Sequence, residues 1–282
     1  MYEGFLFYWL MYDTILLMVI AVLIVLGLCF GSFVNAFVWR LHEGRDWVKE
    51  RSECVHCHHE LAAKDLVPVL SWLWLRGKCR YCHKPISAQY PLIEASTAIL
   101  FVLSWIYWPY LVQGAQIVVF GLWLVILTGL IALLVYDLKW MLLPNKLVFP
   151  LTGLAATMQL MIILSNWQGW GKLLSIAIAV LIGGGIFYIL FQLSDGRWIG
   201  GGDVKLGFLL GLLAGTPAKS LLVIFLAGLL GSLVSLPLIA SKKLGRTSTI
   251  PFGPFLIVAG IIAVLFGNQI IDWYTRAFIT GV

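Results

Sequence analysis

Two aspartates stand out in a chain whose later part is almost free of acidic residues. From residue 95 onward the sequence has no Glu and only four Asp, which are Asp137, Asp195, Asp203 and Asp272. A carboxylate near hydrocarbon is costly, so one kept at the edge of a hydrophobic run is a candidate functional group. Asp137 directly follows such a run, and Asp203 closes the glycine run 200–202. We expect both on one side of a membrane, whereas Asp272 lies on the other side and is interpreted as an interfacial cap.

Two neighbouring carboxylates suit acid–base chemistry, because they cannot easily both ionise and therefore share one proton. The ionised member can take a proton from a water that attacks a peptide carbonyl, while the protonated member supports the oxyanion and the leaving amine. The glycine run 200–202 removes side chains beside Asp203, which would let an extended substrate backbone approach closely. The alternative is that Asp137 and Asp203 only cap helices or pair with Lys139 and Lys205.

A second constellation consists of two Cys-x2-Cys pairs, Cys54 with Cys57 and Cys79 with Cys82, separated by 21 residues. Two residues between thiolates let both point into one tetrahedral site from a tight turn, so the spacing predicts a structural Zn²⁺ site. Disulfides or redox chemistry are the alternative, which a reducing cytosol disfavours. Catalytic zinc is also disfavoured, because four thiolates leave no open position for water.

The elements that must position these residues are membrane helices. Of the 282 residues, 61% are hydrophobic and only 11% are charged, against about 25% charged in soluble domains. A spanning helix needs about 20 apolar residues. Hydropathy predicts eight such helices, at residues 13–39, 92–109, 117–136, 147–164, 173–193, 198–215, 220–240 and 252–271. The expected fold class is an all-α polytopic membrane protein with a small cytosolic zinc-binding segment between its first and second helices.

The basic residues predict the orientation. The segments expected inside are 40–91, 137–146, 194–205 and 241–251. They hold all of the 19 Lys and Arg residues except Lys172, Lys219 and Arg276. This imbalance follows the positive-inside rule and places the N-terminus outside. The net charge of +6 is therefore interpreted as a topology signal rather than as a sign of nucleic-acid binding.

Three parts are expected along the chain. Residues 1–39 lack the basic start of a cleavable signal peptide and are predicted to form a retained first transmembrane helix. Residues 40–91 are too short and too polar for a conventional hydrophobic core, so we expect a zinc ion to hold their fold together. Residues 92–282 are expected to form a seven-helix bundle. The glycines 183–185 are interpreted as a close helix-packing site. The turn 251–254 either lines a substrate groove or starts the last helix with proline.

A series of motifs runs nearly end to end along the chain. They are Gly31-Ser32-Phe33-Val34-Asn35 with Arg40-Leu41, Arg51-Ser52-x-Cys54-x-x-Cys57, Leu70-Ser71-Trp72, Leu75-Arg76-Gly77-Lys78-Cys79-Arg80-Tyr81-Cys82, Pro85-Ile86-Ser87, Tyr90-Pro91, Glu94, Asp137 with Pro144-Asn145, Gly200-x-Gly202-Asp203-x-Lys205, and Pro251-Phe252-Gly253-Pro254. In this order they resemble the bacterial type IV prepilin peptidases, or leader peptidases, which are membrane aspartyl proteases with a GxGD motif. Val55, where the family often has Pro, and Leu143, where it often has Ile, are departures that preserve the surrounding chemistry.

The resemblance implies an aspartic endopeptidase that cuts the short basic leader from prepilins and pseudopilins after a Gly, at the cytosolic face of the bacterial inner membrane. It makes Asp137 and Asp203 the catalytic pair and leaves Asp195 a bystander. The implied substrate-binding residues are Gly200, Gly201, Gly202 and Lys205, and the implied zinc ligands are Cys54, Cys57, Cys79 and Cys82. The resemblance also implies N-methylation with S-adenosylmethionine as methyl donor, for which the sequence offers no binding residues, and a place in type IV pilus and type II secretion assembly.

Two other classes of function compete with a protease. A proton- or cation-coupled transporter would also keep intramembrane aspartates, but it needs acid near the middle of the bilayer, whereas both aspartates are expected near one face. A zinc-bearing scaffold of pilus or secretion assembly would tolerate Asn in place of either Asp, whereas a protease would lose turnover. The expected partners are prepilin substrates and the lipid bilayer, with no nucleic acid, and the sequence indicates no particular oligomeric state.

Overall fold

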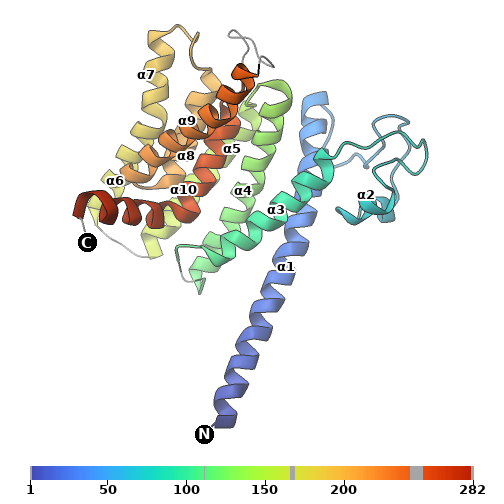
Figure 1. Ribbon diagram of the computed structural model, residues 1–282, viewed down its shortest axis with the longest axis horizontal. Coiled ribbons are helices and arrows are strands. Elements are labelled where there is room, and N and C mark those ends of the chain that lie inside the picture. The colour runs from blue at the N-terminus through green and yellow to red at the C-terminus, as the bar shows by residue number, and fades with distance from the viewer. Residues whose placement is uncertain (1, 111, 166–168, 242–249, 281–282) are drawn as a thin grey trace. The chain divides into compact units, whose positions relative to one another are not determined.

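The chain is built from long helices joined by shorter connections (Figure 1). The computed structural model describes residues 2–110, 112–165, 169–241 and 250–280, with side chains from residue 14 to residue 279. Its α-helices are α1 (Tyr2–Glu43), α2 (Leu70–Trp74), α3 (Gln89–Ile106), α4 (Ala115–Trp140), α5 (Asn145–Ser165), α6 (Trp170–Val180), α7 (Ile186–Leu193), α8 (Gly201–Ala214), α9 (Pro217–Ala240) and α10 (Gly253–Tyr274). The π-helical turn η2 (Leu181–Gly185) joins α6 to α7. Within the described residues, β structure is limited to two isolated bridges.

Seven helical segments of the described chain are long and apolar enough to cross a membrane. They are Thr14–Glu43, Gln89–Ile106, Ala115–Trp140, Asn145–Ser165, Trp170–Leu193, Pro217–Ala240 and Gly253–Ile279. The predicted all-α, multi-pass membrane fold is therefore confirmed, and each of these segments matches one expected from hydropathy.

The eighth expected span, at residues 198–215, is a short helix instead. α8 has 14 residues and ends at Gly215, whose left-handed conformation (φ 66°) closes the helix. At about 1.5 Å per residue it extends roughly 21 Å, which is less than the ~30 Å of a bilayer core. Leu206, Leu209 and Leu210 are nevertheless almost completely buried, so α8 is a core helix of its unit.

The chain divides into two compact units, residues 1–106 and 107–282. In the first, α1 packs along α3 at points where only glycine fits. An added Cβ at Gly27 would meet the backbone of Ala98, and one at Gly31 would lie 2.6 Å from the Cα of Glu94. Small residues that allow backbones to approach closely are typical of helix pairs in membranes.

In the second unit, α8 is held among α5, α6, α10 and η2. An added Cβ at Gly183 would lie 2.7 Å from the carbonyl oxygen of Gly207 and 2.8 Å from the Cα of Gly211, and one at Gly184 would overlap the ring of Phe208. The predicted packing role of glycines 183–185 is confirmed for Gly183 and Gly184, whereas Gly185 faces open space. These contacts fix the helix that carries Asp203.

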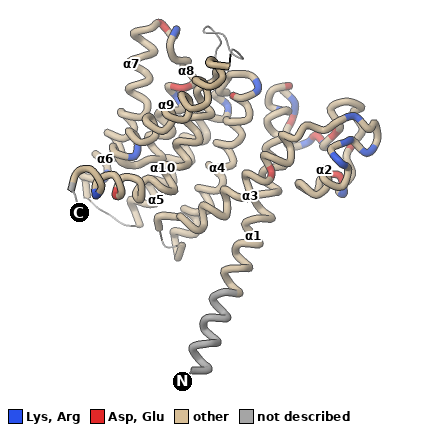
Figure 2. The backbone as a smooth tube through the Cα atoms, viewed as in Figure 1, with Lys and Arg blue, Asp and Glu red and all other residues tan. Residues whose placement is uncertain are grey.

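Charged residues of the second unit gather at the ends of its helices, while the middle of the helices is nearly free of charge (Figure 2). This distribution is what a lipid environment requires of spanning segments. Most of segment 241–251, which we expected to carry part of the inner positive charge, lies outside the described residues.

Candidate functional site

The two Cys-x2-Cys pairs form matching turns. In the first, the N–H of Cys54 donates to the carbonyl of His59 (3.0 Å), and the N–H of His58 donates to the carbonyl of Cys54 (2.9 Å). The same two bonds recur around Cys79, at 2.9 and 3.0 Å. His58 and His83 occupy equivalent left-handed positions, with φ of 55° and 57°. Each turn therefore presents its two thiols through its own backbone bonds.

The four sulfur atoms converge on one point. All lie within 4.8 Å of one another, and the Sγ atoms of Cys54 and Cys82 are 3.9 Å apart. Four thiolates around Zn²⁺ at about 2.3 Å stand roughly 3.8 Å from each other. The predicted ligands are thus brought together in a geometry that can hold a metal ion, and an all-thiolate set suits zinc.

Asp65 ties the chain between the two turns to the second one. Its carboxylate accepts hydrogen bonds from Arg80 Nε (2.6 Å) and the Tyr81 hydroxyl (3.0 Å), and only 3% of its side chain is exposed. Burial by itself would raise the pKa of the Asp65 carboxyl, but the bonds from Arg80 and Tyr81 outweigh this and hold the pKa below its usual value. Sequence reasoning missed this residue, which no spacing rule singles out.

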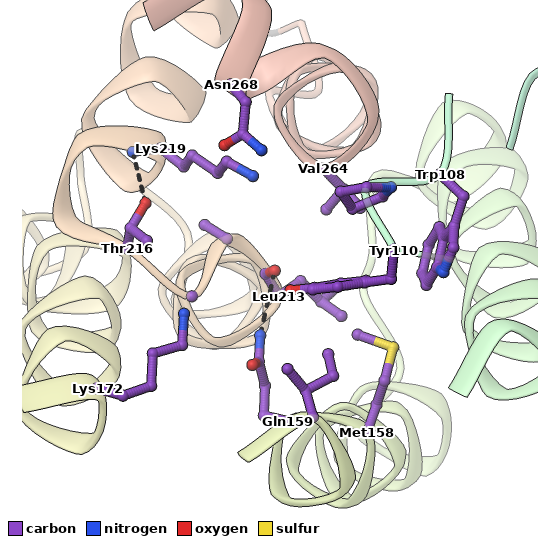
Figure 3. Close-up of a pocket in the computed structure, with 14 residues that line it drawn as sticks. Trp108, Tyr110, Met158, Gln159, Lys172, Leu213, Thr216, Lys219, Val264 and Asn268 are labelled. Carbon is purple, nitrogen blue, oxygen red and sulfur yellow. Dashed lines mark hydrogen bonds between the residues drawn. The ribbon is translucent and has the colours of Figure 1, made fainter. Parts of the chain in front are cut away.

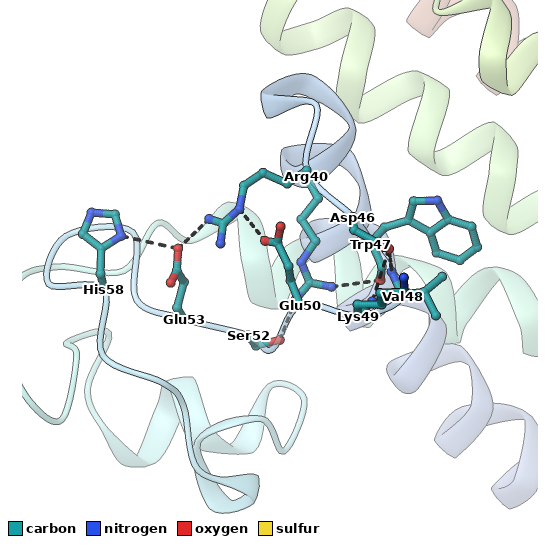
Figure 4. A network of polar contacts seen from close by, with 10 residues as sticks. Arg40, Asp46, Trp47, Val48, Lys49, Glu50, Ser52, Glu53 and His58 are labelled. Carbon is teal, nitrogen blue, oxygen red and sulfur yellow. Dashed lines mark hydrogen bonds and ion pairs between the residues drawn. The ribbon is translucent and has the colours of Figure 1, made fainter.

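A polar network joins the first turn to the end of α1 (Figure 4). Arg40 donates to the carbonyl of Trp47 (3.2 Å) and to the hydroxyl of Ser52 (3.4 Å). Arg45 pairs with Glu53 at 2.6 Å. Arg40 is 8% exposed, so its charge is satisfied by these acceptors rather than by water. The basic residue that closes the first hydrophobic run thus anchors the cysteine segment.

Glu94 anchors the same segment to α3. Its carboxylate accepts a hydrogen bond from the N–H of Val69 (2.7 Å) and is buried. Nearby, Asn35 of α1 donates to the carbonyl of Tyr90 (3.2 Å). These polar contacts hold α1, α3 and the cysteine segment together as one unit.

Asp137 lies in the last turn of α4, where only 5% of its surface is exposed. The helix ends three residues later because Met141 adopts a left-handed conformation (φ 53°). The carboxylate of Asp137 lies against the backbone of Gly253 at the start of α10. A Cβ at Gly253 would overlap this carboxylate, so the glycine makes room for the acid.

Asp203 is the third residue of α8, and its carboxylate lies beside Gly200, the N-cap residue. A negative charge in the first turn interacts favourably with the N-terminal end of the helix dipole. The same carboxylate is close enough to Asp137 for the two charges to interact. The structure therefore brings both predicted acids together, at the C-terminal end of one helix and the N-terminal end of another.

The lysine partners considered from the sequence lie elsewhere. Lys205 donates to the side-chain oxygen of Asn145 (2.8 Å), and Lys139 lies over the ring of Trp140 at 5.5 Å. Across the described residues, neither Asp137 nor Asp203 has an ion pair within 4.0 Å. Asp203 lies in the first turn of α8, where the expectation of helix capping stays a prediction, but the expectation of lysine pairing is wrong for both acids.

Leu143 fills the space between the two glycine motifs. A Cβ at Gly202 would lie 3.2 Å from the Cβ of Leu143, and one at Gly253 would lie 3.6 Å from its Cδ1. Gly202 is thus a packing residue, while Gly200 is exposed and would meet only the Asp203 carboxylate, at 3.5 Å. The turn 251–254 begins α10 and also contacts Asp137. The prediction that it starts the last helix is confirmed, whereas lining of a substrate groove stays a prediction.

Comparisons with known proteins place the chain in a family. Residues 25–108 match the family model described as bacterial peptidase A24 N-terminal domain, and residues 124–236 match the type IV leader peptidase family. Three relatives carry the name prepilin leader peptidase/N-methyltransferase. The one from Aeromonas hydrophila is 34% identical over 285 residues, 90% of this chain and 92% of its own. Those from Stutzerimonas stutzeri and Bacillus subtilis are 30% and 29% identical and cover 92% and 98% of their own lengths. The chain belongs to the type IV leader peptidase family.

Membership of the leader peptidase family makes the chain a peptidase and confirms the resemblance carried by its motifs. The N-terminal family model spans the four cysteines, and the leader peptidase model spans both Asp137 and Asp203. Gly253 lies beyond that second model. No solved structure matches the chain significantly.

Proposed function

We propose that this leader peptidase removes the short basic leader of type IV prepilins and pseudopilins, cutting after a Gly at the cytosolic face of the bacterial inner membrane. The observation that carries the proposal is that the charges of Asp137, at the end of α4, and Asp203, at the start of α8, are close enough to interact. The names of the relatives supply the substrate class. The positive-inside pattern supports the orientation, because it places these helix ends inside.

The catalytic step that we propose is direct attack by water. Two interacting carboxylates hold one proton between them, so one accepts a proton from the attacking water while the other donates to the carbonyl oxygen. The backbone of Gly253 lies against the Asp137 carboxylate, and Gly200 lies beside the Asp203 carboxylate, which limits the positions that the two acids can adopt. Transfer of a proton to the departing amine completes the cleavage without a covalent intermediate.

Substrate binding is proposed for the open part of the glycine run. Gly200 is exposed beside Asp203, so an extended backbone can approach the acid without meeting a side chain. A substrate whose hydrophobic helix is already in the bilayer would present its leader junction at this level. Lys205 lies two residues beyond Asp203 in α8, where it donates to Asn145, and we propose that it also meets polar groups of the leader.

The cysteine segment is proposed to hold structural Zn²⁺, since its four thiolates complete a tetrahedral shell. N-methylation of the new N-terminus with S-adenosylmethionine is a second proposed activity, supported by the names of the relatives. The zinc ion would rigidify the segment, while the acid–base work stays with the two aspartates. The roles in type IV pilus and type II secretion assembly follow from the substrate class.

The test is cleavage of a synthetic prepilin with a Gly-ending leader by the purified protein, followed by mass spectrometry of both products. Asp137→Asn and Asp203→Asn should each reduce kcat by about 10²–10⁴-fold, the usual contribution of a positioned acid or base. Asp195→Asn is the matched control, because Asp195 is exposed and lies 3.9 Å from Arg197. Full processing by either Asp137→Asn or Asp203→Asn would refute the aspartate mechanism and favour the scaffold or transporter interpretation. A cut elsewhere than after Gly would refute the proposed specificity.

A further inference from the structure

A pocket of about 170 Å³ lies within the unit formed by residues 107–282. Gln159 of α5, Leu213 of α8 and Val264 of α10 contribute to its lining. Two of these helices carry parts of the acid site at their other ends, where Asp203 lies in the first turn of α8 and Gly253 opens α10. The ten residues from Asp203 to Leu213 span roughly 15 Å at 1.5 Å per residue. The pocket and the acid site therefore occupy opposite ends of one helix bundle.

Two lysines from different helices converge in this pocket. Lys172 comes from the start of α6 and Lys219 from the start of α9. Figure 3 shows both side chains reaching toward the space in its middle, and their charges are close enough to repel each other. The stem of Lys219 packs on Gly267, where an added Cβ would lie 3.2 Å from its Cδ and Cε. The fold thus makes room for a side chain whose charge it does not neutralise.

In the described part of the chain, neither Lys172 nor Lys219 has an acidic group within 4.0 Å. From residue 107 onward the sequence offers only four Asp and no Glu. Asp137 and Asp203 lie at the opposite end of the bundle, and Asp195 contacts Arg197. The fourth, Asp272, is exposed near the end of α10 and forms no ion pair with either lysine. Two ammonium groups confined without a counterion favour an anion from outside the chain.

Further hydrogen-bond donors line the pocket. They include the hydroxyl groups of Tyr110 and Thr216 and the side-chain amide of Asn268. The indole N–H of Trp108 is buried without a hydrogen-bond partner among the described residues. Gln159 is already engaged, because its side-chain amide donates to the carbonyl of Leu212 (2.8 Å) and so closes the end of α8.

We propose that this pocket binds a phosphate group, supplied by the headgroup of an anionic phospholipid or by free phosphate. Lysine pairs are common phosphate ligands, and the cavity is smaller than the ~300–1,000 Å³ of typical small-molecule sites, so it suits a single phosphate rather than a nucleotide-sized methyl donor. The ends of spanning helices lie at the level of lipid headgroups. Lys172 and Lys219 are also two of the three basic residues that the sequence places outside, which would make the lipid one of the outer leaflet.

The experiment is thermal unfolding of the full-length purified protein in detergent. Dihexanoyl phosphatidylglycerol, dihexanoylglycerol without a phosphate, and inorganic phosphate are each titrated separately. We expect the midpoint to rise with the phospholipid and not with the diacylglycerol, because a ligand that binds only the folded state stabilises it. Lys172→Gln/Lys219→Gln should lose this rise, and Arg276→Gln, which removes the third outer basic residue, should keep it.

The other results of this titration show where the phosphate group comes from and whether the pocket binds one at all. A lysine-dependent rise with inorganic phosphate alone identifies free phosphate as the ligand. Without any anion, the double variant should melt no lower than the native chain, since it removes a like-charge repulsion. A double variant that responds as the native chain does, or a native chain that responds to none of the three compounds, overturns the proposal. Prepilin cleavage by the double variant should be unchanged, because the pocket is remote from the two acids.

Discussion

The cysteine site and the aspartate pair hold their functional atoms by different means. Each Cys-x2-Cys turn is closed by its own backbone hydrogen bonds, so short-range geometry presents the thiols. Asp137 and Asp203 instead belong to separate helices, and glycines of α10 let that helix approach both of them, at Asp137 of α4 and at Leu210 of α8. We infer that the first site fails when its ion is lost, and the second when a single methyl group is added.

The largest effect is expected from removing one zinc ligand. Cys79→Ala should abolish binding of one zinc ion per chain and unfold residues 44–88, because metal binding supplies about 10–16 kcal/mol to comparable small zinc segments. Zinc analysis and limited proteolysis measure both effects. Cys29→Ala is the control, since Cys29 lies in α1 away from the cluster. Native zinc content in Cys79→Ala would show that the four-thiolate assignment is wrong.

A methyl group at Gly253 should damage the acid site alone. Gly253→Ala would push the Asp137 carboxylate from its place, and a displacement of about 1 Å can cost 10²-fold in rate. We expect kcat for prepilin cleavage to fall by about that factor while zinc content stays native. Gly185→Ala, at a position with no neighbouring atoms within 4 Å, should cleave normally. Equal cleavage rates for the two variants would show that Gly253 does not position the Asp137 carboxylate.

The contact between η2 and α8 should have a smaller, purely energetic effect. Gly207→Ala would press a methyl group into the carbonyl of Gly183, and overpacking of this kind typically costs 1–3 kcal/mol. Unfolding of the purified protein should show a loss of about that size. The comparison is Gly228→Ala in α9, where nothing lies within 4 Å of the added group. Indistinguishable stabilities would show that the η2–α8 contact tolerates expansion.

The smallest effect is expected at Asp65 in the cysteine segment. Asp65→Asn removes the charge but keeps one oxygen that can accept a bond from Arg80 or Tyr81, so only part of the about 1.5–3 kcal/mol that a hydrogen bond to a charged group contributes should be lost. We expect faster proteolysis of the segment with zinc still bound. Glu60→Gln breaks the exposed pair with Arg51, and such surface pairs contribute only about 0–1 kcal/mol. Faster proteolysis of Glu60→Gln than of Asp65→Asn would show that the exposed ion pair stabilises the segment more than the bonds to Asp65 do.

Features that depend on local sequence could be predicted from the residues alone. Hydropathy located the long helices because lipid demands continuous apolar runs. The cysteine spacing predicted the four-thiol cluster because two residues between thiolates let both face one point. The two aspartates could be singled out because acids are scarce in this part of the chain. Their proximity, by contrast, depends on how four helices pack.

Features that depend on long-range packing were beyond the sequence. Hydropathy does not distinguish a full span from a short core helix, so α8 was expected to be longer than it is. Gly253 was part of a recognised turn, but only the fold shows that it contacts Asp137. The sequence offered one hint of the pocket that Lys172 and Lys219 line, because both are exceptions to the positive-inside pattern. Their spacing in the sequence, however, does not predict that they line the same pocket.

The most direct test of the central claim is a double-mutant cycle on kcat/KM for prepilin cleavage with Asp137→Asn, Asp203→Asn and the pair combined. Residues that act as one unit are strongly non-additive. If the two carboxylates share one proton, each single variant should lose nearly all activity and the double variant should lose no more. Losses that multiply in the double variant, or substantial cleavage by either single variant, would contradict the aspartate pair as the catalytic centre.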